Sequence, residues 1–91
     1  MSLFRLRTYV TTPLGVLLVS SIDLHGIFGS TKPVHPSRRF ERNVFRCDGM
    51  GRVVDWSGFR GLVAHYETAE EAQAGHEKLV NDLLKAAPEK N

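Results

Sequence analysis

Hydrophobic and polar residues alternate along the first part of the chain. In "LFRLRTYV", residues 3–10, apolar and polar side chains occupy opposite sides of an extended backbone. The apolar side holds Phe4, Leu6 and Val10, and the polar side holds Arg5, Arg7 and Tyr9. This period of two predicts a half-buried β-strand. The next segment, "VLLVSSIDL" (residues 16–24), is apolar on both sides at its start, which predicts a central strand.

Three further segments favour strands after a long irregular stretch. They are "FERNVFRC" (residues 40–47), "RVVDW" (residues 52–56) and "FRGLVAHY" (residues 59–66), with "DG" and "SG" as the reversals between them. Five such strands are compatible with an antiparallel meander, although the sequence does not give the strand order.

The end of the chain predicts a helix over "TAEEAQAGHEKLVNDLLKAA", residues 68–87. Thr68 and Glu71 have the spacing of a capping box. Apolar residues recur at helical spacing at Ala72, Leu79, Val80, Leu83, Leu84 and Ala87, and Pro88 marks the end. We therefore expect the α+β class, with an antiparallel β-sheet of about four to five strands and one C-terminal α-helix packed on one face.

Length and composition indicate one globular domain over residues 1–91, since 42% of the residues are hydrophobic and 24% are charged. The apolar run "GVLLV" is too short to span a membrane. Two arginines interrupt "MSLFRLRTYV", so we expect no signal peptide. Cys47 is the single cysteine, which suits a reducing cytoplasm. A sheet covered on one side only favours a homo-oligomer at this size.

The net charge of +2 is unevenly distributed. Residues 1–66 carry nine Lys and Arg against four acidic residues, a net charge of +5, and residues 67–91 carry three Lys against six acidic residues, a net charge of −3. A basic body with an acidic tail suits an anionic partner. A solvated surface of mixed charge accounts for the same numbers.

The irregular segment, residues 25–39, is longer than the roughly 4–6 residues of most connections. Its cations continue into the next strand and are interleaved with aromatic residues. Cations hold phosphates and aromatic rings stack on bases, so a nucleotide or a single-stranded nucleic acid fits that chemistry, and we predict a nucleotide-type ligand. The predicted ligand-binding residues are Lys32, His35, Arg38, Arg39, Arg42, Trp56 and His76. Duplex nucleic acid fits less well, because the predicted helix is acidic at its start.

Gly75 and His76 stand inside the predicted helix, where glycine costs about 1 kcal/mol relative to alanine. In one interpretation, Gly75 lets the helix approach the sheet and His76 is half-buried with a polar partner. In the other, His76 lies at a pocket between helix and sheet and binds a ligand or transfers a proton. At the end of the fifth strand we expect Tyr66 to face the core and His65 to point outward.

Catalytic and metal-binding signatures are weak. No histidine pair has a compact metal spacing, Cys47 has no evident base, and neither a P-loop nor a Gly-x-Ser-x-Gly elbow is present. We predict no catalytic residue, no metal and no cofactor. A small hydrolase that uses His76 or His65 remains an alternative.

Four stretches carry a resemblance: "VSSIDL" at residues 19–24, the proline-containing loop, "FERNVF" at residues 40–45 and "HYETAEEAQAGHEKLV" at residues 65–80. Together they resemble a family of small uncharacterised proteins from phage and prophage genomes. The last stretch, with its "EAxAGH" pattern, is the specific part. The chain departs from the family at Ile27-Phe28, where members carry Asp-His, and at Arg42, where they carry a small hydroxyl residue.

The resemblance implies a phage origin and a place in the cytoplasm of an infected bacterium. By analogy with phage proteins that sequester nucleotide signals of host defence, we expect a non-enzymatic accessory protein that binds an anionic, nucleotide-like ligand. The alternative is a protein-interaction module that inhibits or adapts a host or virion protein. Composition does not separate the two.

Overall fold

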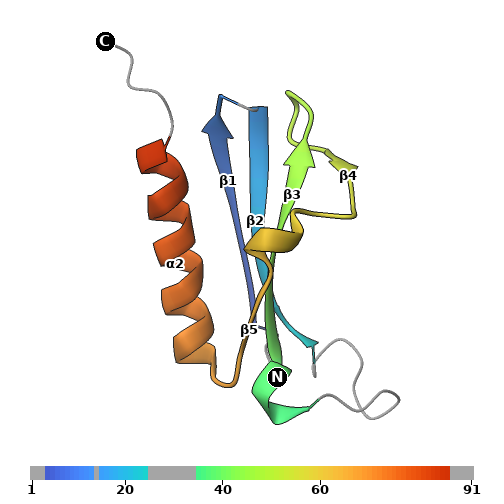
Figure 1. The fold of residues 1–91 in the computed structure, drawn as a ribbon. Coiled ribbons are helices and arrows are strands. Elements are labelled where there is room, and N and C mark those ends of the chain that lie inside the picture. Colours follow the sequence, from blue (N-terminus) through green and yellow to red (C-terminus); the bar gives the residue numbers. More distant parts are fainter. Residues whose placement is uncertain (1–3, 14, 25–34, 87–91) are drawn as a thin grey trace.

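The structure of the chain, a computed structural model, describes residues 4–13, 15–24 and 35–86. Within these residues the elements are, in chain order, β1 (Arg5–Thr12), β2 (Gly15–Asp23), the 3₁₀ helix η2 (Pro36–Arg38), β3 (Phe40–Cys47), β4 (Val53–Asp55), the 3₁₀ helix η3 (Arg60–Leu62), β5 (Ala64–Tyr66) and the α-helix α2 (Ala69–Ala86). The predicted α+β class is confirmed, because a five-stranded antiparallel sheet carries α2 against one side (Figure 1).

The strand order differs from a simple meander. β1, β2 and β3 pair in sequence, but β4 and β5 both pair with β3, at different ends of its outer edge. Between them the backbone N–H of Phe59 donates to the carbonyl of Val44 at 3.1 Å, so the connecting segment follows β3. The predicted fifth strand is correspondingly short, since its first half forms η3 and only Ala64–Tyr66 is extended.

The register divides the side chains of the sheet between two faces. The face toward α2 contains the core residues Val10, Leu17, Val19 and Val44, together with Leu79 from the helix. The open face, which is the side away from α2, is formed by Arg5, Arg7, Tyr9, Ser20, Ile22, Glu41, Asn43 and Phe45. The polar side of "LFRLRTYV" is therefore part of the open face.

The capping box at the start of α2 is confirmed in a modified form. The hydroxyl of Thr68 accepts the backbone N–H of Glu71 at 3.1 Å, while the Glu71 carboxylate accepts the N–H of Glu67, one residue earlier than expected, at 3.3 Å. From there α2 runs beside β1 and β2 (Figure 1), and it buries Ala72, His76 and Leu79 against the sheet. No helix among the described residues is long and apolar enough to cross a membrane.

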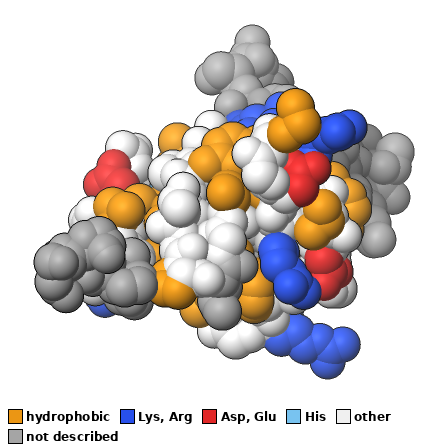
Figure 2. Space-filling model, turned by 90° about the horizontal axis from the view of Figure 1, so that it is seen from above, with side chains coloured by type: hydrophobic (Ala, Val, Ile, Leu, Met, Phe, Trp, Pro, Cys, Tyr) orange, Lys and Arg blue, Asp and Glu red, His pale blue; other side chains and the backbone are white. Residues whose placement is uncertain are grey.

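The turn between β3 and β4 is held by Asp48, whose carboxylate accepts the backbone N–H groups of Met50 and Arg52, each at 2.9 Å. These hydrogen bonds lower the pKa of Asp48. Figure 2 looks onto this end of the molecule and shows exposed hydrophobic side chains among Lys, Arg, Asp and Glu side chains. Met50, which is 81% exposed, is the hydrophobic residue of this turn.

Candidate functional site

The predicted site residues do not gather at one place in the structure. Arg42 and His76 lie between the sheet and α2, whereas Trp56 packs on Phe45, on the open face. His35, Arg38 and Arg39 belong to η2 and the residues that flank it. Lys32, like most of the predicted loop, falls outside the described residues.

The residues around η2 have structural partners. His35 caps η2, since its Nδ1 accepts the backbone N–H of Ser37 at 3.1 Å. Arg39 donates two hydrogen bonds to the carboxylate of Asp23, at 3.1 and 3.0 Å, and its guanidinium lies 5.2 Å from the centre of the Phe40 ring. Arg39 therefore ties η2 to the end of β2, and Arg38 beside it is exposed.

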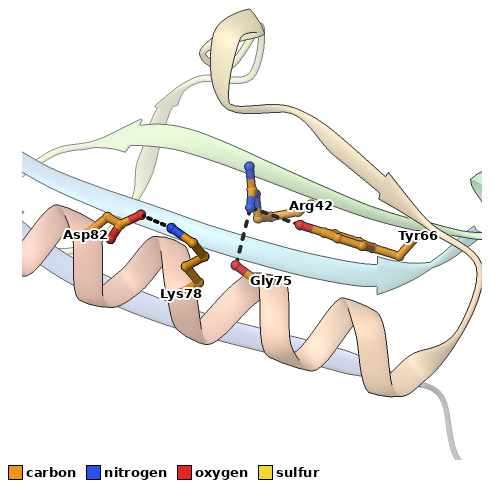
Figure 3. A network of polar contacts seen from close by, with 5 residues as sticks. All are labelled: Arg42, Tyr66, Gly75, Lys78 and Asp82. Carbon is orange, nitrogen blue, oxygen red and sulfur yellow. Dashed lines mark hydrogen bonds and ion pairs between the residues drawn. The ribbon is translucent and has the colours of Figure 1, made fainter.

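Arg42, on β3, makes hydrogen bonds to η3, β5 and α2. Its Nε and Nη2 donate to the carbonyl of Leu62 at 3.2 and 3.0 Å. Its Nη1 donates to the Tyr66 hydroxyl at 3.0 Å and to the Gly75 carbonyl at 3.2 Å (Figure 3). We call these four residues the Arg42 cluster. The cation thus satisfies backbone acceptors at the end of η3 and inside α2.

Gly75 completes the Arg42 cluster by leaving room for Tyr66. A Cβ atom at Gly75 would lie 2.9 Å from Cε1 of Tyr66 and nearer still to its Cζ and hydroxyl oxygen. The first interpretation of Gly75, that it lets the helix approach the sheet, is confirmed. The expected orientations at the end of β5 are confirmed as well, since Tyr66 faces α2 and His65 contacts Glu41 on the other side.

His76 is only 3% exposed and bridges two strands to the helix. Its Nε2 lies 2.9 Å from the hydroxyl of Thr8, and its Nδ1 lies 2.8 Å from the hydroxyl of Ser21. A neutral imidazole donates one of these hydrogen bonds and accepts the other. Burial, helped by the charge of Arg42 and opposed by Glu77, lowers the pKa of His76. The half-buried histidine of the first interpretation is therefore a fully buried one with two partners.

Because the pKa of His76 is lowered in the folded protein, its neutral form stabilises the fold. This stabilisation is complete above the unfolded pKa of about 6.5 and is lost as the pH falls below it. We expect the melting temperature of the wild-type protein to fall between about pH 7 and pH 5 more steeply than that of His76→Gln. Both proteins contain the other histidines of the chain, so the difference isolates His76. Parallel pH profiles would contradict the prediction.

The open face is accessible at one end and covered at the other. Leu18 is 1% exposed on this face, between its cross-strand neighbours Tyr9 and Phe45. The β3–β4 turn approaches there, since a Cβ atom at Gly51 would lie 3.7 Å from the Tyr9 ring. Nearer the start of β1, the open face holds the row Arg7, Ser20 and Asn43 and the row Arg5, Ile22 and Glu41.

A small cavity of about 170 Å³ lies on this accessible part. We call it the Trp56 cavity, and its lining residues are Ser20, Ile22, Glu41, Asn43, Phe45 and Trp56. The Trp56 and Phe45 rings have centroids 5.1 Å apart and are tilted by 60°. Trp56 is nevertheless 68% exposed, so most of its surface is available to a ligand.

The turn after β4 places Trp56 at this position. The carboxylate of Asp55 accepts the backbone N–H of Ser57 at 3.0 Å. Gly58 follows with a φ of +75°, and a Cβ atom there would lie 3.2 Å from the carbonyl of Val44. Only glycine fits at this close approach to β3. The close approach of the turn to β3 places Trp56 over Phe45.

Polar groups complete the floor of the Trp56 cavity. Asn43 Nδ2 donates to Glu41 Oε1 at 3.0 Å, and His65 Nε2 lies 3.2 Å from Glu41 Oε2. The second N–H of the Asn43 amide and the hydroxyl of Ser20 add hydrogen-bonding capacity. The cavity thus combines one aromatic wall with a polar floor, a combination typical of small-molecule sites.

Two cations stand on the same face. Arg5 and Arg7 are exposed, and Arg7 lies opposite Ser20 in the register. Burial and the charge of Asp48 raise the pKa of the Cys47 thiol. The positive charge of Arg7, on another strand of the sheet, opposes this rise. The raised pKa keeps this thiol protonated.

Arg5, Arg7, Asn43 and Phe45 were not among the site residues predicted from the sequence. The alternation of "LFRLRTYV" already placed both arginines on one polar side. The sequence did not predict which strand lies beside these arginines, because the order of strands is set by the pairing within the sheet. Trp56 is the predicted residue that the structure brings to this cavity.

A larger hollow, of about 610 Å³, lies where β5 meets α2. Ser37, His65, Tyr66, Glu67, Glu71 and Ala74 line it. This lining contains two carboxylates, those of Glu67 and Glu71, and no Lys or Arg, so the hollow is unsuitable for an anionic ligand. Within the described part of the chain, no group of three or more His, Cys, Asp and Glu residues is placed to hold a metal ion.

Comparisons of the chain with protein-family models, with curated proteins and with solved structures found no match. The resemblance to small phage proteins therefore stays a prediction, and the site must be interpreted from its own geometry.

Proposed function

We propose that this protein binds a nucleotide-type ligand on the open face, with the base at the Trp56 cavity and the phosphate at the arginines of β1. The exposed Trp56 ring beside Phe45 carries the proposal, because base stacking on aromatic rings is tolerant of base identity and contributes about 1–3 kcal/mol per base. A cavity of about 170 Å³ is smaller than the roughly 300–1,000 Å³ of sites that enclose a whole drug-sized ligand. It suits one ring of a ligand whose remainder lies on the surface.

The placement of the arginines supports the second half of the proposal. Arg7 and Asn43 are separated in the register by Ser20 alone, which corresponds to two strand spacings or roughly 10 Å. The flexible Arg7 side chain spans part of that distance. A ligand with its base at Asn43 therefore has its phosphate within reach of Arg7, and Arg5 lies two residues along the same side.

The proposed site keeps Trp56 from the sequence prediction and replaces its other residues. Arg42 and His76 hold the helix to the sheet, and Arg39 pairs with Asp23. In the biological setting that the phage resemblance implies, the protein acts without catalysis in the cytoplasm of an infected bacterium and sequesters a nucleotide-like defence signal.

The test uses the intrinsic fluorescence of Trp56, the single tryptophan of the chain. Linear and cyclic mononucleotides, dinucleotides and short single strands are titrated into the protein. We expect saturable quenching by at least one of these classes. We expect Arg7→Ala to weaken the binding and to reduce its dependence on salt, because Arg7 contacts phosphate. No fluorescence change with any class would refute the proposal.

Trp56→Ala should weaken the binding of that ligand by about 1–3 kcal/mol, or roughly 5- to 150-fold, because the stacking surface is lost. Isothermal titration calorimetry measures this variant, which lacks the fluorophore. Trp56→Phe retains a ring and should recover part of the affinity. The matched control is Leu84→Ala, which truncates another exposed hydrophobic residue on α2, away from the open face. Equal affinities for Trp56→Ala and Leu84→Ala would contradict the assignment of the site.

A further inference from the structure

The outer edge of β1 is long and regular. Its eight residues pair with β2 in an unbroken register from Arg5↔Ile22 to Thr12↔Gly15, with no bulge and no proline. Among the described residues, no strand pairs with the other side of β1, because β1 ends the strand order. Natural proteins shorten, bend or interrupt such edges, since an unpaired edge is a template for another strand.

The backbone direction shows which residues would pair there. The carbonyl of Phe4 accepts the N–H of Asp23 at 3.2 Å, so the even-numbered residues of β1 hydrogen-bond to β2. In an antiparallel ladder the alternate residues direct their N–H and C=O groups the other way. Those residues are Arg5, Arg7, Tyr9 and Thr11, whose side chains lie on the open face.

We propose that β1 pairs with the β1 strand of a second copy of this chain, antiparallel, about a two-fold axis at Thr8. This register places Arg5 opposite Thr11, Leu6 opposite Val10, Arg7 opposite Tyr9 and Thr8 opposite its own copy. Residues 5–11 of β1 all have partners in this register. Arginine opposite tyrosine, an aliphatic pair and a threonine pair are all favourable cross-strand combinations.

Neighbouring registers are less favourable. Moving the axis to Arg7 puts Arg7 opposite its own copy, and moving it to Leu6 puts Arg5 opposite Arg7. Like charges directly opposite each other destabilise a ladder. Moving the axis to Tyr9 brings Pro13 opposite Arg5 and shortens the pairing. The sequence of β1 is thus most self-complementary about Thr8, which favours a second copy over an unrelated strand.

The shape beside the edge agrees with this pairing. On the helix side, a hollow of about 310 Å³ lies next to Thr8 and is lined also by His76, Glu77, Val80 and Asn81. On the other side, the open faces of the two copies join, and the Arg5 and Arg7 side chains of both lie between the two Trp56 cavities.

Sedimentation equilibrium of the ligand-free protein tests the assembly. We expect a mass of twice 10.2 kDa in the micromolar range. Tyr9→Pro should give monomers, because it removes an outward N–H at the interface and leaves the hydrogen bonds to β2 in place. Tyr9→Thr keeps the N–H and should remain dimeric. A monomeric wild-type protein up to millimolar concentration would overturn the proposal.

Cysteine cross-linking tests the register in a Cys47→Ser background. The two copies of residue 8 would be a directly opposed pair without hydrogen bonds, with Cα atoms about 4.5 Å apart, within the range that a disulfide bridges. We expect Thr8→Cys to cross-link under mild oxidation, and Arg7→Cys and Tyr9→Cys to cross-link at least tenfold more slowly. Faster cross-linking of either control would overturn the register. Both experiments omit nucleotide, so their failure is distinct from a failure of ligand binding.

Discussion

Gly75→Ala lowers the free energy of unfolding by about 2–4 kcal/mol, although alanine is the better helix former by about 1 kcal/mol. The added Cβ would overlap the ring of Tyr66. The ring has no easy way to move, because its hydroxyl accepts a hydrogen bond from Arg42 at 3.0 Å. Overpacking costs about 1–3 kcal/mol, and loss of a hydrogen bond to a charged group costs about 1.5–3 kcal/mol. Together these exceed the gain in helix propensity.

Urea unfolding of wild type and Gly75→Ala measures this effect. The control is the same substitution in a Tyr66→Ala background, where the obstructing ring is absent. In that background we expect Gly75→Ala to stabilise the protein by up to about 1 kcal/mol, as in an unobstructed helix. The reversal of sign identifies Tyr66 as the cause. A higher melting temperature for the single variant would refute the close approach of α2 to β5.

Arg42→Met lowers the free energy of unfolding by about 3 kcal/mol or more. Methionine fills part of the same space but offers no donor, so the Leu62 carbonyl and the Tyr66 hydroxyl lose their hydrogen bonds from Arg42. The loss of a hydrogen bond to a charged group costs about 1.5–3 kcal/mol. For a domain of 91 residues, whose total stability is on the order of 5–14 kcal/mol, this is a large fraction.

Arg46→Met is the matched control, since Arg46 lies on the same strand and the same side but is exposed. We expect this surface substitution to change the free energy of unfolding by less than about 0.5 kcal/mol. The loss of unfolding free energy in Arg42→Lys should lie between those of Arg42→Met and Arg46→Met, because an ammonium group replaces only some of the hydrogen bonds of the planar guanidinium. If Arg42 bound a ligand instead, Arg42→Met would reduce affinity at an unchanged melting temperature. That result would contradict the structural role of the Arg42 cluster.

The Arg42 cluster and the His76 bridge act together. Arg42 links β3, η3 and β5 to α2, while His76 links β1 and β2 to the same helix one residue after Gly75. The Arg42 charge also lowers the pKa of His76. Two polar residues that were predicted from the sequence to bind a ligand thus secure the helix on the sheet.

Three local patterns identified the first two strands and the helix: the alternation of "LFRLRTYV", the apolar run "VLLVSSIDL" and the capping box at Thr68. Each of these patterns depends only on neighbours within a few residues. The fifth strand was less predictable. Phe59 N–H bonds to the distant carbonyl of Val44, and that long-range contact turns half of the expected strand into η3.

The sequence by itself determined the α+β class, the orientations of His65 and Tyr66 and the presence of an unusual glycine at Gly75. The tertiary structure alone decided that Arg42 meets Gly75 and Tyr66 and that Arg7 shares a face with Asn43 and Phe45. Periodicity specifies which side of an element a residue occupies, but it cannot specify the element packed against that side. Strand pairing joins residues that are far apart in the chain, and the proposed site depends on that pairing.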